Sequence, residues 1–306
     1  MNKKILFIGY GSIAIKHIKI IKKKTKSPIY VLSKHFKGEK KLIKISLKKA
    51  LNTTYEYCFI CTPSTERMKY LKLFENNCKS FFLEKPISNN YKKAKYTLSK
   101  IKSKKNIYIG YVFRNNLIIK SLKKIIEQKK LGIINSVQVI SRSYMPSWRN
   151  NIDYKNSVSS KKSKGGGVLL ELSHEIDILF YLFGNIKLFS KRLTRSKNLK
   201  INVEDRADIM FLNKNKIPIN LLLDFNSYLN ERRIIINGSK SLIDVNLNSN
   251  FYYIYTRNKK KKYEFKNEIS KMFYRQLTNY VNNNFKNNSV IDSLKVLKII
   301  DEIKKN

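Results

Sequence analysis

Residues 5–14 read ILFIGYGSIA, and this stretch decides the fold of the chain. Its first four residues are apolar and typical of a short strand buried on both faces of a parallel sheet. The spacing G-x-G-x-x-A follows at Gly9, Gly11 and Ala14. Residues 12–24 then carry apolar side chains at helical intervals. A strand, a glycine turn and a helix in this order predict a unit that binds a dinucleotide.

Each small residue of this turn has a physical role in such a unit. Gly9 permits the tight turn, Gly11 lets the backbone approach a pyrophosphate, and Ala14 lets the helix pack close to the strand. The free N–H groups at the helix start face the phosphates with a favourable dipole, which places Ser12 and Ile13 among the expected cofactor-binding residues. The alternative is a turn whose small residues serve steric needs alone. The flanking strand and helix favour the dinucleotide.

Composition and charge limit the class of protein. A chain of 306 residues that is 42% apolar is long enough for two domains with a sizeable core. The net charge of +43, from 64 basic and 21 acidic residues, first suggests a nucleic-acid binder. The lysines are spread along the whole chain, however, which is typical of compositional drift on a tolerant surface. We therefore expect no nucleic-acid partner, although a positive field can steer an anionic cofactor or substrate.

The sequence gives no sign of membrane insertion or of a disulfide framework. No apolar run approaches the ~18 residues that a membrane helix requires. The basic N-terminus superficially resembles a signal peptide, but its apolar run is short and ends in the glycine turn, so we expect a cytoplasmic protein without a membrane partner. Cys58 and Cys61 fall in one apolar strand and face opposite sides, and Cys78 stands alone. We interpret all three as buried or incidental thiols.

Strands and helices alternate over residues 1–111, which is the pattern of a doubly wound α/β domain. We therefore assign residues 1–112 to a dinucleotide-binding Rossmann domain with a parallel sheet. The expected strands are 5–8, 28–33, 42–45, 57–61, 80–83 and 107–111, and the expected helices are 12–24, 47–51, 65–76 and 89–102.

The pattern changes after residue 112. Turn signals such as Asn237-Gly238 now separate consecutive strands. We assign residues 113–306 to a second α/β domain, with a largely antiparallel open sheet, for substrate binding and oligomerisation. The expected strands are 136–144, 188–194, 207–212, 219–225, 233–236, 242–245, 251–255 and 262–265, and the expected helices are 117–128, 168–183, 268–285 and 290–304.

The ends of two parallel strands border the crevice where an open α/β sheet binds its ligand. An Asp or Glu after the second strand would bind the ribose 2′-hydroxyl of NAD, but this chain has Ser33 and Lys34. A hydroxyl followed by a cation suits the 2′-phosphate of NADP, so we expect NAD or NADP and favour NADP, although Lys34 is also one lysine among many. Thr62 and Pro63, after the fourth strand, complete the cofactor-binding residues expected at this edge.

Glu84-Lys85-Pro86 directly follows another apolar strand and belongs to the same crevice. A lysine at this place can protonate or orient a substrate oxygen, especially if burial lowers its pKa. In a lysine-rich chain, Lys85 is equally well a surface residue.

The second constellation begins with three glycines, 165–167, which lead into an apolar helix with Glu171, His174 and Asp177. The spacing of three places these side chains on one helix face. A histidine beside a carboxylate is a natural proton shuttle, and the chain has only 3 histidines. The alternatives are a histidine satisfied within the core and a metal ligand. No further ligands are evident in the sequence, and we expect no metal.

These motifs together resemble the Gfo/Idh/MocA oxidoreductase family over essentially the full chain. The resemblance implies an N-terminal Rossmann domain, a C-terminal open-sheet domain that mediates self-association into a dimer or tetramer, and an NAD(P)-dependent redox step on a sugar-like alcohol. It implies that Lys85 contacts cofactor and substrate, and that His174 is the acid/base on the reacting hydroxyl. The residues that resemble the family's sheet are Phe225, Arg233, Ile236, Gly238 and Asp244.

Two positions depart from the family's pattern. The family usually has an Asp four residues before its His, where this chain has Leu170, so we assign the third catalytic role to the nearest acid, Glu171. The family also often has a His where this chain has Arg67. We further expect Glu84 to bind the cofactor, and Arg114 and Asp177 to bind the substrate.

The loop 144–149 holds the one tryptophan of the chain, Trp148, beside Arg149, and Tyr154 follows it. The loop is similar to that of family members associated with bacterial surface-sugar biosynthesis. An aromatic residue beside a cation suits stacking on a sugar together with a contact to a phosphate or carboxylate, so we expect these three residues to bind substrate. A packed loop anchor is the alternative.

The function expected from the sequence is hydride transfer between NAD(P) and the hydroxyl or keto carbon of a sugar-like substrate. His174 would move the hydroxyl proton, and Lys85 would stabilise the developing oxyanion. A nucleotide-activated or acidic sugar is the finer hypothesis. The alternatives are an NAD-dependent glycoside-cleaving enzyme that uses transient oxidation, and a non-catalytic dinucleotide sensor.

Overall fold

The computed structural model describes residues 3–102, 106–149, 153–285 and 288–305. The chain divides into two compact units, and each is described by itself. The first comprises Met1–Val112 and Phe273–Leu297, and the second comprises Phe113–Met272 and Lys298–Asn306. The assignment of a cofactor domain to 1–112 and of a substrate domain to 113–306 stays a prediction. Over the described ranges, no helix has the length and apolar content needed to cross a membrane.

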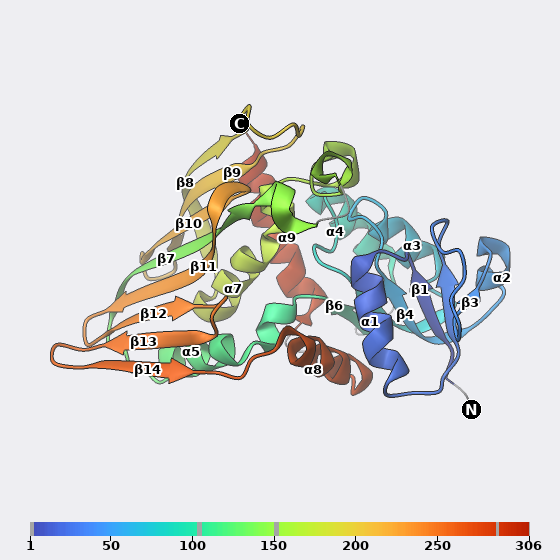
Figure 1. Cartoon of the computed structure of the whole chain (residues 1–306), viewed down its shortest axis with the longest axis horizontal. Helices are drawn as coiled ribbons and strands as arrows, with labels where there is room; N and C mark the ends of the chain where they lie inside the picture. Colours follow the sequence, from blue (N-terminus) through green and yellow to red (C-terminus); the bar gives the residue numbers. More distant parts are fainter. Residues whose placement is uncertain (1–2, 103–105, 150–152, 286–287, 306) are drawn as a thin grey trace. The chain divides into compact units, whose positions relative to one another are not determined.

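The described part of the first unit contains a six-stranded sheet in which all neighbouring strands are parallel (Figure 1). Its strands are β1 (Ile5–Ile8), β2 (Ile29–Leu32), β3 (Ile43–Lys44), β4 (Tyr55–Ile60), β5 (Cys78–Leu83) and β6 (Ile107–Ile109). Their order in the sheet is β3-β2-β1-β4-β5-β6. The chain changes direction across the sheet between β1 and β4, the switch point at which doubly wound sheets bind ligands. This confirms the expected Rossmann sheet.

A row of aromatic rings crosses this sheet and forms the centre of its core. The rings of Phe7, Phe59, Phe82 and Tyr108 lie on neighbouring strands in register, and their successive centroids are 4.5, 5.1 and 5.4 Å apart. Stacked rings at these distances combine a large buried apolar area with a favourable ring geometry. Two helices pack against this face of the sheet, α1 (Ser12–Lys22) and α8 (Ile269–Val281). The first unit also contains α2 (Leu47–Leu51), α3 (Arg67–Leu73), α4 (Tyr91–Lys100) and the start of α9 (Val290–Lys304).

The described part of the second unit contains an eight-stranded sheet (Figure 1). Its strands are β7 (Ile134–Tyr144), β8 (Ile186–Thr194), β9 (Arg206–Asn213), β10 (Pro218–Asp224), β11 (Asn226–Gly238), β12 (Leu242–Asn246), β13 (Phe251–Tyr255) and β14 (Lys260–Glu264). The order is β14-β13-β12-β11-β7-β10-β9-β8. β7 and β10 run parallel, and the other neighbours are antiparallel. The largely antiparallel open sheet expected from the sequence is thereby confirmed.

One face of the second sheet is buried and the other is open. Ile234 of β11 and its register partner Val139 of β7 are buried, whereas Gln138 and Arg233, one residue away on each strand, point to the opposite face. Self-association through the open face stays a prediction. The helices of this unit are α5 (Leu117–Glu127), α6 (Val168–Glu171), α7 (Ser173–Phe183) and the end of α9 (Val290–Lys304), joined by short 3₁₀ turns η2 (Val112–Asn115), η3 (Met145–Trp148), η4 (Tyr154–Asn156) and η5 (Lys162–Lys164).

The single helix expected over residues 168–183 is two helices. α6 ends at Glu171, and Leu172 has a φ of −93° and a ψ of 27°, outside the regular helix, before α7 begins at Ser173. Serine is a poor residue inside a helix because its hydroxyl competes for backbone hydrogen bonds, and a common one at a helix start. This break changes the relation expected between Glu171 and His174.

Candidate functional site

The glycine turn after β1 has the geometry that its two glycines predict. Gly9 has a φ of +94°, and a Cβ atom there would lie 3.0 Å from the carbonyl carbon of Cys61 and 3.2 Å from the amide nitrogen of Thr62. A Cβ atom on Gly11 would meet nothing within 4 Å. Gly11 is also the N-cap of α1, which has no side-chain cap. The N–H groups at the start of α1 therefore face open space, which a side chain at position 11 would begin to fill. Ala14, within the first turn of the helix, is fully buried.

The structure brings the ends of three strands together at this turn. The amide of Gly9 donates a 3.0 Å hydrogen bond to the carbonyl of Leu32, next to Ser33, and the amide of Cys61, next to Thr62, donates a 2.9 Å bond to that of Ile8. Ser33 is half-buried and its Oγ accepts a bond from the amide of His35. Four more of the expected cofactor residues lie on this edge. Ser12 and Lys34 are exposed, and Ile13 and Pro63 are half-buried.

Glu84, another expected cofactor residue, is buried and held by a histidine that sequence reasoning missed. Nε2 of His17 lies 2.7 Å from Oε1 of Glu84, and Oε2 accepts a hydrogen bond from the amide of Lys85. Burial acts to raise the pKa of the Glu84 carboxyl, but the hydrogen bond and charge of His17, with the charges of Arg67 and Lys85, outweigh it and lower the pKa. The available signal was a histidine on the inner side of the first helix, six residues after Gly11.

Arg67 stands where the resembling family often has a histidine, and it braces two strand ends. Its Nε donates a 3.0 Å hydrogen bond to the carbonyl of Thr62, and Nη1 donates to the carbonyl of Pro86. The side chain is 7% exposed. The arginine thus connects the segment after β4 with the segment that carries Lys85. Lys85 itself is half-buried, and its role stays a prediction.

In the second unit, Arg114 and Asp177 are brought together as a buried pair. The guanidinium Nε lies 2.9 Å from Oδ2 and Nη2 lies 2.6 Å from Oδ1. Arg114 is 4% exposed and Asp177 is fully buried. Paired, fork-like contacts of this kind satisfy much of the hydrogen-bonding capacity of both groups. The pair connects η2 with α7, and a contact of either residue with substrate stays a prediction.

His174 lies one turn before Asp177 on α7 and is half-buried. Its ring packs edge-on against Phe113, with centroids 5.1 Å apart. Glu171 does not share the helix of His174, because it is the last residue of α6, so the single helix face expected for the three residues is wrong. Its Oε2 accepts a 3.0 Å hydrogen bond from Oγ of Ser159. The catalytic roles expected for His174 and Glu171 stay predictions.

Sequence reasoning also missed a second buried carboxylate next to the histidine. Glu175 is 1% exposed, and its Oε1 lies 2.7 Å from Nε of Arg232 on β11. The guanidinium carbon of Arg232 is 4.4 Å from the centroid of the Phe113 ring, the same ring that contacts His174. The signal in the sequence was an acidic residue inside an apolar helix, since such residues are rarely buried unless they are paired.

The loop expected to bind a sugar is anchored at its tryptophan. Nε1 of Trp148 donates a 2.9 Å hydrogen bond to Oγ of Ser143, and the indole packs edge-on against Phe225, with centroids 4.9 Å apart. The hydroxyl of Tyr154 accepts a 3.3 Å bond from the amide of Lys200. Arg149 is exposed. These contacts favour the packed anchor for Trp148 and leave substrate contacts of the loop as a prediction.

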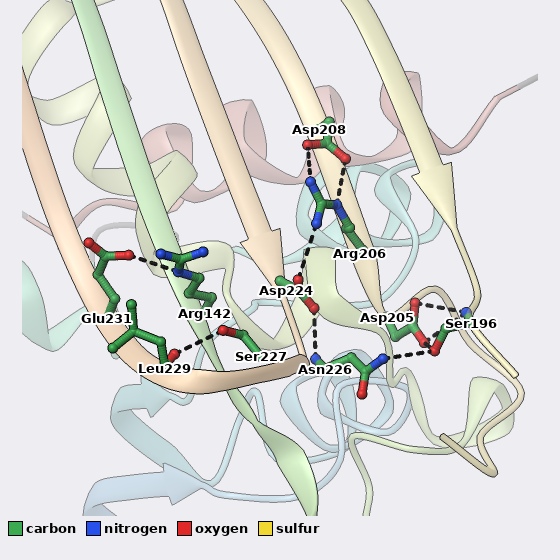
Figure 2. Close-up of polar contacts among 10 residues, drawn as sticks. All are labelled: Arg142, Ser196, Asp205, Arg206, Asp208, Asp224, Asn226, Ser227, Leu229 and Glu231. Atoms are coloured by element: carbon green, nitrogen blue, oxygen red, sulfur yellow. Dashed lines mark hydrogen bonds and ion pairs between the residues drawn. The ribbon is translucent and has the colours of Figure 1, made fainter. Parts of the chain in front are cut away.

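Figure 2 shows polar contacts of Asp224 and Asn226, the residues on either side of Phe225 where β10 ends and β11 begins. The carboxylate of Asp224 accepts a 2.7 Å hydrogen bond from the amide of Asn226. The side-chain amide of Asn226 lies 3.3 Å from Oγ of Ser196, whose hydroxyl donates to the buried Asp205 at 2.6 Å. The strand end on which Trp148 packs is therefore held by side chains from β10, β11 and the segment between β8 and β9.

The cysteines and acidic residues do not form a metal centre in the part of the chain that the structure describes. Cys58, Cys61 and Cys78 are free and buried. Burial, the largest cause, raises the pKa of the Cys58 and Cys61 thiols, and a buried thiol with a raised pKa is unreactive. Within the described ranges, no three or more His, Cys, Asp or Glu side chains are grouped so that they could hold an ion.

Comparisons with known proteins found a family match within the second unit and one curated relative. Residues 119–244 match the family model of the GFO/IDH/MocA C-terminal domain. The uncharacterized oxidoreductase YrbE of Bacillus subtilis (strain 168) is 26% identical over 129 residues, which cover 42% of this chain and 35% of that protein. The matched segment thus spans about a third of the length of this curated relative.

Solved structures share the whole fold. The 3-ketoreductase KijD10 from Actinomadura kijaniata, in complex with NADP and TDP-benzene, superposes with a TM-score of 0.83 at 11% identity, over 99% of this chain and 97% of that one. The WlbA dehydrogenase from Bordetella pertussis, in complex with NADH and UDP-GlcNAcA, superposes with a TM-score of 0.80 at 17% identity, over 99% and 95%. The resemblance to the Gfo/Idh/MocA oxidoreductases is thereby confirmed: residues 119–244 match the C-terminal domain model of that family, and the solved structures share the fold.

Proposed function

We propose that this protein is an NAD(P)-dependent dehydrogenase or reductase of a sugar-like substrate. The observation that carries the proposal is the turn between β1 and α1, where Gly9 is required by the backbone and Gly11 faces open space at an uncapped helix start. Such a turn accepts a pyrophosphate because the helix N–H groups and dipole favour an anion and no Cβ atom blocks its approach. Gly9, Gly11, Ser12, Ile13, Ala14, Ser33, Lys34, Thr62, Pro63 and Glu84 would hold the cofactor.

The residues of this chain would supply binding and proton transfer. A nicotinamide cofactor, when bound, supplies the hydride acceptor or donor. His174 would take the proton of the substrate hydroxyl in oxidation, or return it in reduction, because an imidazole ring can both accept and donate a proton. Lys85 would orient the same oxygen and stabilise its developing charge. Glu171 would assist in proton transfer through its position at the end of α6.

The finer proposal is a nucleotide-activated or acidic sugar. The similar KijD10 was solved with TDP-benzene and the similar WlbA with UDP-GlcNAcA. The high positive charge of this chain also favours an anionic substrate over a neutral one.

The test is a titration of the purified protein with NADH and with NADPH at matched salt, followed by the fluorescence of the reduced nicotinamide. Saturable binding of either form in the micromolar range supports the proposal. No binding of either form, in protein that carries no cofactor already, contradicts it. Cofactor that co-purifies and is never released during turnover would instead favour the glycoside-cleaving alternative.

A further inference from the structure

We propose that Arg232 binds an anionic group of the substrate, a carboxylate or a phosphate, beside His174. This inference rests on the proposed function and names the substrate chemistry of the same site. It starts from an unusual pairing of charges in the second unit.

Three other arginines of this unit bind their carboxylates as forks. Arg114 donates to Asp177, Arg206 to Asp208 and Arg233 to Asp244, and each uses both Nε and Nη2. Arg232 differs from them. Its Nε lies 2.7 Å from Oε1 of Glu175, but neither partner has a hydrogen bond of good geometry there, among the residues that the structure describes. Glu175 is thus a counter-charge for Arg232 and not a fork partner.

Part of the Arg232 side chain reaches the surface. Its Nε is buried, while 22% of the side chain remains exposed. The planar guanidinium lies 4.4 Å from the ring centroid of Phe113, which favours a fixed orientation over free rotation. A guanidinium has five N–H donors, and within the described ranges no side chain other than Glu175 forms an ion pair with Arg232. A guanidinium that rests against an aromatic ring and keeps its Nη donors available can receive a carboxylate or phosphate as a fork.

Arg232 lies close to His174, the residue proposed to move the substrate's proton. Phe113 contacts the guanidinium on one side and the ring of His174 at 5.1 Å, and Glu175 directly follows His174 in the chain. An anion bound to Arg232 would therefore be a part of the same molecule whose hydroxyl meets His174. The buried carboxylate of Glu175 contacts the guanidinium at Nε and so leaves the Nη donors for another partner.

The test compares R232K with R233K. The lysine at 232 keeps the charge beside Glu175 and the overall field of the protein but loses the fork. Arg233 is its neighbour on β11, points to the open face and pairs with Asp244, so R233K makes the same chemical change away from the site. Each protein is first titrated with NADH, which tests the cofactor proposal separately. Calorimetric titrations of the NADH-saturated proteins with D-glucuronate, D-glucose 6-phosphate and neutral D-glucose follow.

We expect the wild type and R233K to bind one of the two anionic sugars more tightly than D-glucose, and we expect R232K to lose about 10- to 100-fold in affinity for that anion alone. A preference for glucuronate identifies a carboxylate, and a preference for the 6-phosphate identifies a phosphate. The proposal is overturned if the wild type prefers neither anion, or if R232K keeps the preference. If R232K does not fold, the double variant E175Q/R232Q, which removes both buried charges, replaces it with the same expected result.

Discussion

Nε2 of His17, on α1, lies 2.7 Å from Oε1 of Glu84, at the end of β5. Both side chains are buried, and the His17 ring packs edge-on against Phe82 and Phe273. The contact ties the helix of the dinucleotide turn to the residue that precedes Lys85. Two sequence motifs that lie far apart in the chain are therefore joined by a buried polar contact within the core of one unit.

The first prediction concerns the pH dependence of this contact. The pKa of Glu84 is lowered in the folded protein, so the unfolded chain takes up its proton at higher pH. The contribution of ionised Glu84 to the free energy of unfolding is therefore complete above the ordinary carboxyl pKa of 4.5. It is lost as the pH falls below that value. We expect E84Q to lower the free energy of unfolding by about 1–3 kcal/mol at pH 7, and the difference from wild type to shrink in acid. Urea unfolding at a series of pH values measures it.

The matched control is E127Q, which removes a carboxylate from the surface of α5. It should follow the wild type at every pH. A gap between wild type and E84Q that stays constant down to pH values well below 4.5 would show that the charge of Glu84 contributes nothing to stability.

The second prediction separates the two glycines of the turn. In G9A, the methyl group would lie 3.0 Å from the backbone of Cys61 at a φ of +94°, so we expect a loss of about 1–3 kcal/mol in stability. In G11A the methyl group meets nothing within 4 Å, so the fold should be unchanged while NADH binding weakens. Thermal unfolding and NADH titration of both variants measure these effects. Full NADH affinity in G11A would contradict the proposed approach of the pyrophosphate to this backbone.

Much of this fold follows from local sequence, whereas the charged core does not. The strand before Gly9 and the helix after it are set by short-range apolar spacing, and the parallel order follows from repeated alternation. The pairs His17–Glu84, Arg114–Asp177 and Arg232–Glu175 join residues that are 57 or more positions apart. No local periodicity encodes such a partner. A buried charge in an apolar segment signals only that a partner must exist.

The break between α6 and α7, just before His174, could not be predicted from the spacing of apolar residues. Spacing by three correctly places His174 and Asp177 on one helix, α7, but the same rule fails for Glu171 because the chain leaves helical geometry at Leu172. The helical spacing of apolar residues continues across such a break when the residues on both sides are apolar and buried, so the sequence does not reveal the break. Backbone angles at one residue therefore decide whether a carboxylate shares the face of the histidine.

The third prediction tests the choice of cofactor. Lys34 is exposed after β2, so its replacement should leave the fold intact. If Lys34 contacts the 2′-phosphate of NADP, K34A should weaken NADPH binding by roughly 10- to 100-fold and change NADH binding little, because the lost contact is charge-assisted and present only in NADPH. K37A, which removes another exposed lysine from the same loop, controls for the general field. Equal losses of NADPH affinity in K34A and K37A would assign the effect to net charge and would show that Lys34 does not select NADP.

The last prediction concerns the buried pair between Arg114 and Asp177. In D177N the guanidinium keeps its charge in a site with 4% exposure and loses its carboxylate, so we expect a loss of about 3–5 kcal/mol in the free energy of unfolding. The double variant R114M/D177L removes both charges and should recover most of this loss, since no uncompensated charge remains buried. Chemical unfolding of the three proteins, with the midpoint as the measured quantity, distinguishes a buried ion pair from two independent residues.

D244N is the matched control for this pair. Asp244 receives the same two-nitrogen contact from Arg233, but on the open face of the sheet, where the arginine side chain is 41% exposed. Water can solvate the guanidinium that remains, so D244N should cost only about 0–1 kcal/mol. Equal losses in D177N and D244N would mean that burial does not set the strength of these contacts. A small loss in D177N alone would mean that another group of the folded protein compensates the charge of Arg114.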